Sequence, residues 1–253
     1  MDATGDLKGD LNGDIQDHIR AYQDLVGSDI QFAFQTILDA EMLEVVAFEA
    51  LVRGIRSESA ATVISRIRHE QRFDFDQACR IRAIEAAARN QLEGDIHLNC
   101  SDIKPGNVKL VANVLLHIAR RYGIDSERLV LELGNLDQLN TGGQLEEVAS
   151  ALETAGLRRL ADNFGRRNAD LRPVIQFLPE QLKLDRKLTS GIHENRGSQA
   201  IVHACRRLCQ ELGITVIAAG VESIDEFRWL QEAGIERFQG YFFAEPGLDD
   251  GQR

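Results

Sequence analysis

Five apolar segments of the chain each carry one side chain that could bind a cation or a polar ligand. These side chains are three carboxylates, an amide and an amine, in the order Glu49, Asn99, Glu132, Asp162 and Lys183. A charged group beside a buried strand is costly unless it binds something. The pattern therefore predicts that the five residues meet in one shared site.

A repeated order of amphipathic helix, glycine and apolar strand would position these residues. Glycine suits the end of a helix because it adopts positive φ angles without strain. Ser223, with Glu226 three residues later, predicts a capping box at the start of another helix. Three predicted helices end at a glycine and lead into an apolar strand: 111–122, 145–155 and 198–212.

The predicted strands favour a closed barrel. Strands that alternate with helices indicate βα units and a mostly parallel sheet. Eight such units in about 220 residues are typical of a TIM-like barrel, whose active sites lie at the C-terminal ends of the strands. An open doubly wound sheet is the alternative, but no Gly-x-Gly-x-x-Gly loop follows the early strands. The candidate strands are 31–37, 43–51, 95–100, 128–133, 157–162, a short strand near 182–185 within the segment 173–185, 214–219 and 237–243.

Composition and charge exclude several partners. The 253 residues are 43% hydrophobic and carry a formal net charge of −11, which does not favour duplex nucleic acid or anionic lipid. No apolar run approaches the ~20 residues of a membrane span, so membrane insertion is not expected. The four cysteines lack the spacing of a zinc site and are expected to be reduced thiols of a cytoplasmic protein.

We divide the chain into three parts. Residues 1–29 form an acidic tail, with seven aspartates against Lys8 and Arg20, and contain a short amphipathic helix. Residues 30–248 form the barrel domain, and residues 249–253 a C-terminal tail. The short helix is expected to pass through Ile19, Tyr22 and Leu25.

The same segments resemble the EAL domain family of cyclic di-GMP phosphodiesterases. Glu49-Ala50-Leu51-Val52-Arg53-Gly54 resembles the family's second strand with its signature, and Phe32-Ala33-Phe34-Gln35 resembles its first. Further matches follow in the family's order over residues 30–247: Leu98-Asn99, Leu131-Glu132, Leu182-Lys183-Leu184-Asp185-Arg186, Ala218-Ala219-Gly220-Val221-Glu222 and Gln239-Gly240-Tyr241 through Pro246.

This resemblance implies an α/β fold, a modified TIM-like (β/α)8 barrel whose first strand runs antiparallel. Active members of this bacterial signalling family hold two Mg²⁺ or Mn²⁺ ions and hydrolyse cyclic di-GMP to linear pGpG. It implies that the first metal ion is bound by Glu49, Asn99, Glu132 and Asp162. It implies that Lys183 holds the attacking water. Contacts with the nucleotide are implied for Gln35, Leu51, Arg53, Asp185, Glu222, Gln239 and Pro246.

Three positions depart from the family pattern at residues that serve catalysis. Asn163 replaces the second acid of Asp-Asp-Phe-Gly, and Ala219 replaces the first glutamate of Glu-Gly-Val-Glu. Asn135 replaces the second glutamate of Glu-x-x-Glu, which braces the following loop. That loop has gained Arg166 and Arg167, which we expect to be solvated rather than to clamp the nucleotide.

Charge balance argues against a second metal ion. Two divalent cations ~3.5–4 Å apart need carboxylates to offset their repulsion, and the motif supplies only three. Asn163 keeps an oxygen but lacks the charge, and Ala219 supplies neither a ligand nor a proton acceptor. Loss of a positioned base typically lowers the rate by ~10²–10⁴-fold. We expect one Mg²⁺ or Mn²⁺ site, no second metal ion, and absent or very slow phosphodiester cleavage.

Three functions are open at this point. We favour a degenerate EAL domain that acts as a cyclic di-GMP receptor or as an interaction module for a regulatory protein partner. A homodimer is compatible with this function. The second is an active phosphodiesterase in which Glu222 or Asp185 replaces the lost acid. The third is a protein-binding regulator that no longer binds nucleotide.

Two residues have simpler alternative roles. His97 lies on the same strand face as Asn99 and could be a replacement metal ligand, but we expect a hydrogen-bonded barrel residue. Lys183 could pair with Asp185 without any function.

Overall fold

Eight strands close into a barrel because β1 pairs with β2 on one edge and with β8 on the other. The computed structural model describes residues 15–24, 29–134, 136–139 and 142–248. The strands are β1 (Ile30–Asp39), β2 (Glu44–Gly54), β3 (Asp95–Asn99), β4 (Leu129–Leu133), β5 (Arg158–Phe164), β6 (Gln181–Leu184), β7 (Thr215–Ala218), β8 (Arg237–Phe238) and β9 (Gly247–Leu248).

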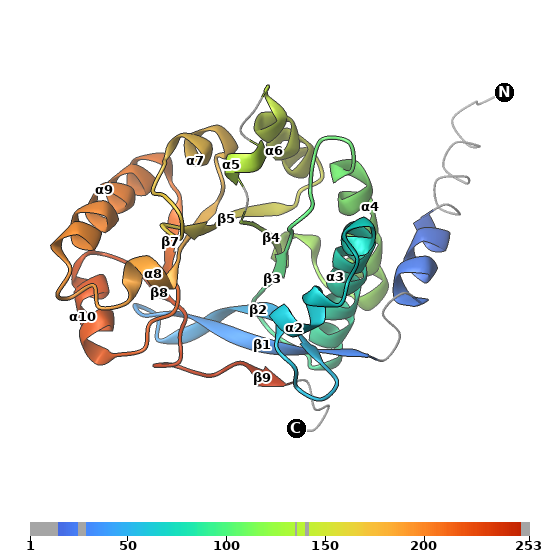
Figure 1. Ribbon diagram of the computed structural model, residues 1–253, viewed down its shortest axis with the longest axis horizontal. Helices are drawn as coiled ribbons and strands as arrows, with labels where there is room; N and C mark the ends of the chain where they lie inside the picture. The colour runs from blue at the N-terminus through green and yellow to red at the C-terminus, as the bar shows by residue number, and fades with distance from the viewer. Residues whose placement is uncertain (1–14, 25–28, 135, 140–141, 249–253) are drawn as a thin grey trace.

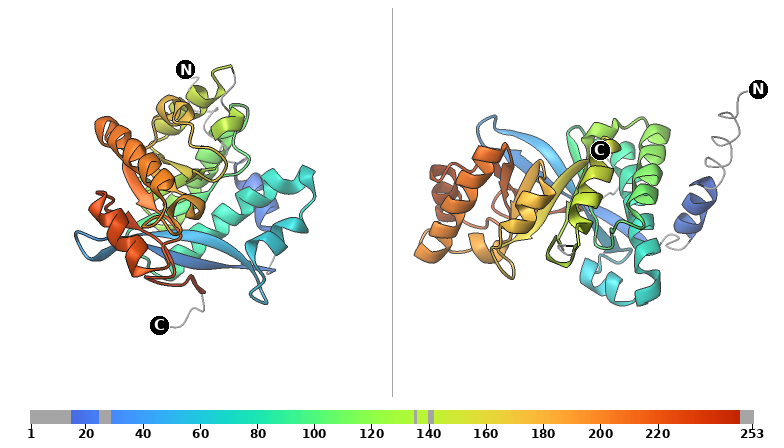
Figure 2. Two further views of the ribbon diagram at one scale, coloured as in Figure 1. Left: turned by 60° about the vertical axis from the view of Figure 1, so that its left-hand side comes forward. Right: turned by 90° about the horizontal axis from the view of Figure 1, so that it is seen from above.

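Helices surround much of the barrel. In Figure 1, α4, α6, α9 and α10 form an arc outside the strands, and the β1–β2 hairpin crosses below this arc. The two further views in Figure 2 show the same outer layer from the side and from above. The helices are α2 (Ala60–Ser65), α3 (Arg72–Arg89), α4 (Val108–Tyr122), α5 (Leu136–Leu139), α6 (Gln144–Thr154), α7 (Arg172–Phe177), α8 (Arg186–Thr189), α9 (Arg196–Leu212) and α10 (Ile224–Glu232), with short 3₁₀ turns at His69–Gln71 and Ser126–Arg128.

The first strand runs antiparallel to its neighbours, as expected. Strand β1 pairs antiparallel with β2 and β8, whereas the pairs from β2–β3 to β7–β8 are parallel. The short strand β9 pairs with Ala33 and Phe34 of β1. The sequence pattern did not predict β9 or helices α2, α3, α5, α7 and α8. The strand predicted over 237–243 ends at Phe238.

The interior of the barrel is built in layers of inward-facing side chains, as in TIM barrels. At the N-terminal end of the parallel strands, ion pairs link Arg158 to Asp95 and Arg237 to Asp39. Above them lies a compact apolar layer made of Ile37, Ala47, Val130, Leu160 and Ile217. The predicted functional residues lie beyond this layer, towards the C-terminal ends of the strands.

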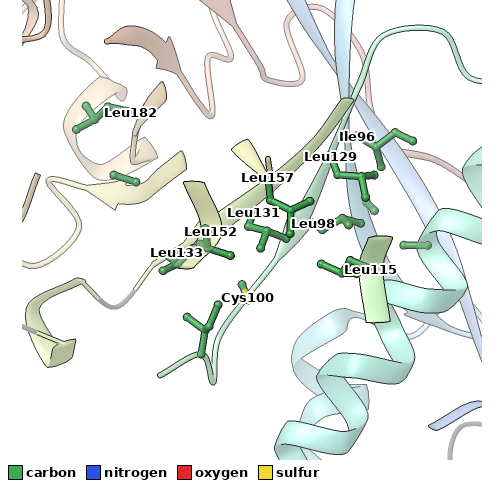
Figure 3. Close-up of a cluster of buried hydrophobic side chains, with 14 of the residues drawn as sticks. Ile96, Leu98, Cys100, Leu115, Leu129, Leu131, Leu133, Leu152, Leu157 and Leu182 are labelled. Atoms are coloured by element: carbon green, nitrogen blue, oxygen red, sulfur yellow. The ribbon is translucent and has the colours of Figure 1, made fainter. Parts of the chain in front are cut away.

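A larger apolar core lies between the strands and the surrounding helices. Figure 3 shows Ile96 and Leu98 of β3 beside Leu129 and Leu131 of β4, near Leu115 of α4. All five are buried, and burial of such side chains contributes about 1.5–3 kcal/mol each. This core fixes the outer faces of the strands, so their inner faces are held in register.

Residues 15–24 form the expected short helix, which packs on this core. Ile19 and Tyr22 are buried, and Gln23 Nε2 donates to Glu85 Oε1 at 2.6 Å. Leu25, the rest of the acidic tail (1–14) and the tail 249–253 lie outside the described residues. Within the described part of the chain, no helix has the length and apolar character that crossing a bilayer requires.

The predicted helix ends agree with the structure. Helices α4 and α9 end at Gly123 and Gly213, both with positive φ. Helix α10 begins with the capping box of Ser223 and Glu226.

Candidate functional site

The five residues singled out from the sequence come together at one end of the barrel. Glu49 lies on β2, Asn99 ends β3, Glu132 is on β4, Asp162 is on β5 and Lys183 is on β6. Because these strands are parallel, their C-terminal ends meet at one rim. The sequence pattern therefore predicted both the residues and their convergence.

Lys183 lies between two carboxylates at the centre of this site. Its ammonium donates to Glu49 Oε2 at 2.9 Å and to Glu132 Oε1. Asn99 Nδ2 donates to the other oxygen of Glu49 at 3.3 Å. The alternative pairing of Lys183 with Asp185 is wrong, because the Asp185 carboxylate caps helix α8 through Lys187 N.

His97 is a buried barrel residue, as predicted. Its Nδ1 lies 2.8 Å from Glu132 Oε1, and burial followed by the positive charge of Lys183 lowers the pKa of His97 to about 3. The imidazole is therefore neutral, and in its Nδ1–H tautomer it donates to Glu132 Oε1. Glu132 Oε1 thus accepts twice, whereas Oε2 is buried and receives no hydrogen bond from a described residue.

The carboxylates of the site differ in how readily they ionise. Burial acts to raise the pKa of Glu49, but Lys183 and the hydrogen bond from Gln239 outweigh it, and the value falls to about 2. Burial, then the charge of Glu49, raises the pKa of Glu132 to about 8. Burial also raises the pKa of Asp162 to about 7. At neutral pH the site therefore contains one permanent ion pair and two acids that ionise more fully when another cation approaches.

Two glutamines extend the hydrogen-bond network towards β1 and β8. Gln239 Nε2 donates to Glu49 Oε2 at 2.7 Å and to Gln35 Oε1 at 3.2 Å. The amide of Gln35 donates in turn to the carbonyl of Ala244 at 3.4 Å. Both glutamines therefore lie beside the carboxylates.

Two of the residues that depart from the family pattern, Asn163 and Ala219, lie at the same rim. Asn163 has a positive φ of 62°, and its Nδ2 donates to Asp162 Oδ2 at 2.6 Å. Arg166 Nη1 donates to Asn163 Oδ1 at 3.0 Å. Ala219 directly follows β7 and brings only a methyl group. Asn135 lies outside the described residues.

The remaining predicted ligand contacts are more widely spread. Leu51 lines a cavity of about 190 Å³ together with Glu49 and Asn99. Arg53 is half-buried and donates to the carbonyl of Val52. Glu222 forms an ion pair of 2.5 Å with Arg186. Pro246 precedes β9.

Sequence reasoning missed one buried cation beside the site. Arg80 of α3 is 3% exposed, and its Nη1 donates to the carbonyl of Asn99 at 3.1 Å. Its side chain also donates to Gln77 of the same helix. The sequence did carry a signal for Arg80. It is a charged residue at a position of the helix that faces the core, among the apolar residues Ala78, Ile81 and Ile84.

Comparison with known proteins identifies the family of this chain. A model of the EAL domain matches residues 19–246. The chain belongs to the EAL domain family. A standalone EAL protein of Vibrio cholerae, solved in a form described as c-di-GMP bound, is 32% identical, with a TM-score of 0.81 over 88% of this chain and 94% of that one. The manganese/cy-diGMP complex of Klebsiella pneumoniae BlrP1 is 31% identical, with a TM-score of 0.80 over 88% of this chain and 57% of that chain.

Curated relatives include an antirepressor as well as a probable phosphodiesterase. The EAL domain is 28% identical to the "Blue light- and temperature-regulated antirepressor BluF" of Escherichia coli over 86% of this chain and 54% of that protein. It is 23% identical to "Probable cyclic di-GMP phosphodiesterase PdeN" of the same organism over 86% of this chain and 44% of that protein. The chain therefore spans about half the length of these two relatives. It is an EAL-domain signalling protein related to both.

The role of His97 in holding Glu132 can be tested by substitution. His97→Leu removes the Nδ1–H donor while keeping a similar apolar volume, so we expect the free energy of unfolding to fall by about 1–3 kcal/mol. Urea denaturation followed by circular dichroism measures this loss. His97→Asn, whose Nδ2 can replace the donor, should recover part of it. Equal stability of His97→Leu and wild type would contradict the role.

Proposed function

We propose that this EAL domain is a receptor for cyclic di-GMP that does not hydrolyse it at a rate typical of a phosphodiesterase. The single observation that carries the proposal is the state of position 163. Asn163 is neutral, its Nδ2 is bound to Asp162 Oδ2, and its Oδ1 accepts from Arg166. The same rim has a methyl group at Ala219 in place of a proton acceptor. The residues proposed to bind the nucleotide and one cation are retained, whereas the acids that would complete catalysis at positions 163 and 219 are absent.

The alternative of an active phosphodiesterase needs a substitute acid, and the two candidates are engaged elsewhere. The Asp185 carboxylate caps helix α8 through a 2.9 Å hydrogen bond from Lys187 N. The Glu222 carboxylate pairs with Arg186. Neither therefore supports replacement of the acid lost at position 163.

Several features support binding of a cyclic dinucleotide. The cavity beside Glu49 has apolar walls that include Phe32 and Leu51 and polar groups that include Asn99. Apolar walls with a few oriented polar groups are typical of small-molecule sites. The Vibrio cholerae and Klebsiella pneumoniae structures, both above 30% identity, are described as complexes with this nucleotide.

One divalent cation fits the donors of this site. Oxygen ligands of the kind present at Glu49, Asn99, Glu132 and Asp162 suit Mg²⁺ or Mn²⁺. Glu132 Oε2 is buried and receives no hydrogen bond from a described residue, so it is available as a ligand. Within the described ranges, no three His, Cys, Asp or Glu side chains are grouped to hold a metal, so binding requires them to rearrange. A bound cation would supply positive charge to a phosphate group; we propose a single such ion and no second.

The output of the receptor is proposed to be a contact with a regulatory protein partner. The relation to BluF, which is described as an antirepressor, supports an output through another protein. A homodimer is compatible with this output. The four cysteines are free thiols, and this supports the cytoplasm as the proposed location.

Calorimetric titration with cyclic di-GMP, with and without Mg²⁺, followed by chromatography of the products, tests the proposal. We expect saturable binding and no accumulation of pGpG during incubation with Mn²⁺. Rapid conversion to pGpG would favour the active phosphodiesterase. A complete lack of binding under both conditions would favour a regulator that works through protein contacts alone.

A further inference from the structure

A second cavity opens at the rim of the barrel, on the side of Asp162 that faces helices α5 and α7. Its volume is about 200 Å³, and its polar lining includes Asp162, Asn163, Arg166, Arg167 and Asn168. The cavity lies next to the carboxylate site and shares Asp162 with it. A ligand that contacts Asp162 would therefore border this cavity.

Arg166 is held in a defined position above this cavity. Its backbone N–H donates to Asn163 O at 3.1 Å, and its Nη1 donates to Asn163 Oδ1 at 3.0 Å. The Asn163 amide is fixed in turn, because Nδ2 donates to Asp162 and packs closely on Gly134, where an added methyl group would lie 2.7 Å from that nitrogen. Arg166 is thus oriented by an ordered contact, although its side chain is exposed.

The charge of Arg166 is not neutralised by a neighbouring acid. Two other acids line the cavity, but Asp170 pairs with Arg172, and Asp137 accepts from Asn168. Neither Arg166 nor Arg167 forms an ion pair with a described residue. With Nη1 on Asn163, the guanidinium of Arg166 keeps Nη2 and Nε as donors for a ligand.

We propose that Arg166, which the sequence alone led us to expect to be solvated, instead binds a phosphate oxygen of the cyclic dinucleotide at this edge of the site. The inference rests on the proposed function, since it names a group that would hold the nucleotide without cleaving it. A guanidinium matches phosphate geometry and remains charged at all physiological pH values. The guanidinium of Arg166 supplies positive charge beside Asp162. Asn163 is neutral, so it attracts cations less strongly than a carboxylate at this position would. Nucleotide binding is therefore expected to persist without divalent metal.

The test is titration of cyclic di-GMP in buffer with EDTA and again with Mg²⁺. Arg166→Gln is expected to weaken binding in EDTA by about 10-fold or more, because a charge-assisted hydrogen bond is lost. Arg166→Lys keeps the charge without the planar fork and should give an intermediate affinity. Arg172→Gln is the matched control, because this exposed arginine belongs to the same segment but is paired with Asp170. Its affinity should equal that of wild type.

The outcomes separate this inference from the proposed function. Wild type that binds in EDTA, with a selective loss in Arg166→Gln, supports it. Wild type that binds only with Mg²⁺, or an Arg166→Gln variant that binds as tightly as wild type in EDTA, overturns the inference and leaves the receptor function standing. Lack of binding by wild type in both buffers would overturn the receptor function itself. Because Arg166 is exposed, the variant should keep the circular dichroism spectrum of wild type.

Discussion

Asn163→Asp combined with Ala219→Glu is expected to raise the rate of cyclic di-GMP hydrolysis at least ~10²-fold above wild type in Mn²⁺. The first substitution adds a charged oxygen ligand beside Asp162, and the second adds a proton acceptor after β7. Both positions are at the rim where Glu49 and Lys183 meet. Chromatographic measurement of pGpG formed with time provides the comparison.

Single substitutions separate the effect of the added metal ligand from the effect of the added proton acceptor. Asn163→Asp alone should give a smaller gain, because the contact with Arg166 would become an ion pair with the new carboxylate. Ala219→Gln in the double variant is the matched control, since it fills the same space without a basic oxygen. If the double variant makes no more pGpG than this control, the assignment of the lost catalytic positions is wrong.

Lys183→Met is expected to lower the free energy of unfolding by about 3–5 kcal/mol in metal-free buffer at neutral pH. Removal of one partner from a buried ion pair leaves an uncompensated charge, and Lys183 is the partner of both Glu49 and Glu132. Urea denaturation provides the measurement. Lys187→Met is the matched control, because Lys187 is exposed on the next element and should change stability by less than about 0.5 kcal/mol.

The raised pKa values of Glu132 and Asp162 make the stability of the wild-type protein depend on pH. Glu132 and Asp162 have folded pKa values of about 8 and about 7, above their unfolded values of about 4.3 and 3.9. The folded state therefore binds more protons, and these groups make the protein less stable as pH rises from about 5 to 8. Glu49 acts in the opposite sense: its pKa of about 2 gives stability above about pH 4.3 that is lost as pH falls towards 2.

Without the Lys183 ammonium, the pKa values of these acids should rise further, so Lys183→Met should lose more stability at about pH 8 than at about pH 5.5. Adding Glu132→Gln to this variant removes one unpaired carboxyl group and should recover part of the loss. A loss that is the same at both pH values, with no recovery, would show that the ion pairs do not set the effect.

Much of the barrel could be predicted because its helices and strands are marked by local patterns. Glycines such as Gly123 and Gly213 follow amphipathic helices and end them with positive φ. The strands that carry Glu132 and Asp162 are apolar and short. Helix α7 and strand β9 were missed because their six and two residues are too few to show a periodicity. The 18-residue helix α3 was missed because the charged residues Arg80 and Glu85 interrupt its buried face.

The residues of the site could be predicted from the sequence, but the contacts between them could not. The position of Lys183 between Glu49 and Glu132 depends on the stagger of strands more than 50 residues apart along the chain. The contact of Arg166 with Asn163 depends on a positive φ at an asparagine, which the residue type permits but does not require. Contacts of this kind follow from tertiary geometry and from loop conformation, and a residue pattern specifies neither.

The apolar layer of Ile37, Ala47, Val130, Leu160 and Ile217 divides the inside of the barrel into two polar compartments. The ion pairs of Arg158 and Arg237 lie on its far side. A layer of low dielectric does not screen charges from one another, and Asp95 and Arg158 both act on His97. Because they shift the pKa of His97 in opposite directions, this lower ion pair leaves little net effect on the site above it. A change of charge in the upper compartment therefore has to be matched mainly by Lys183 or by an ion that enters from solvent.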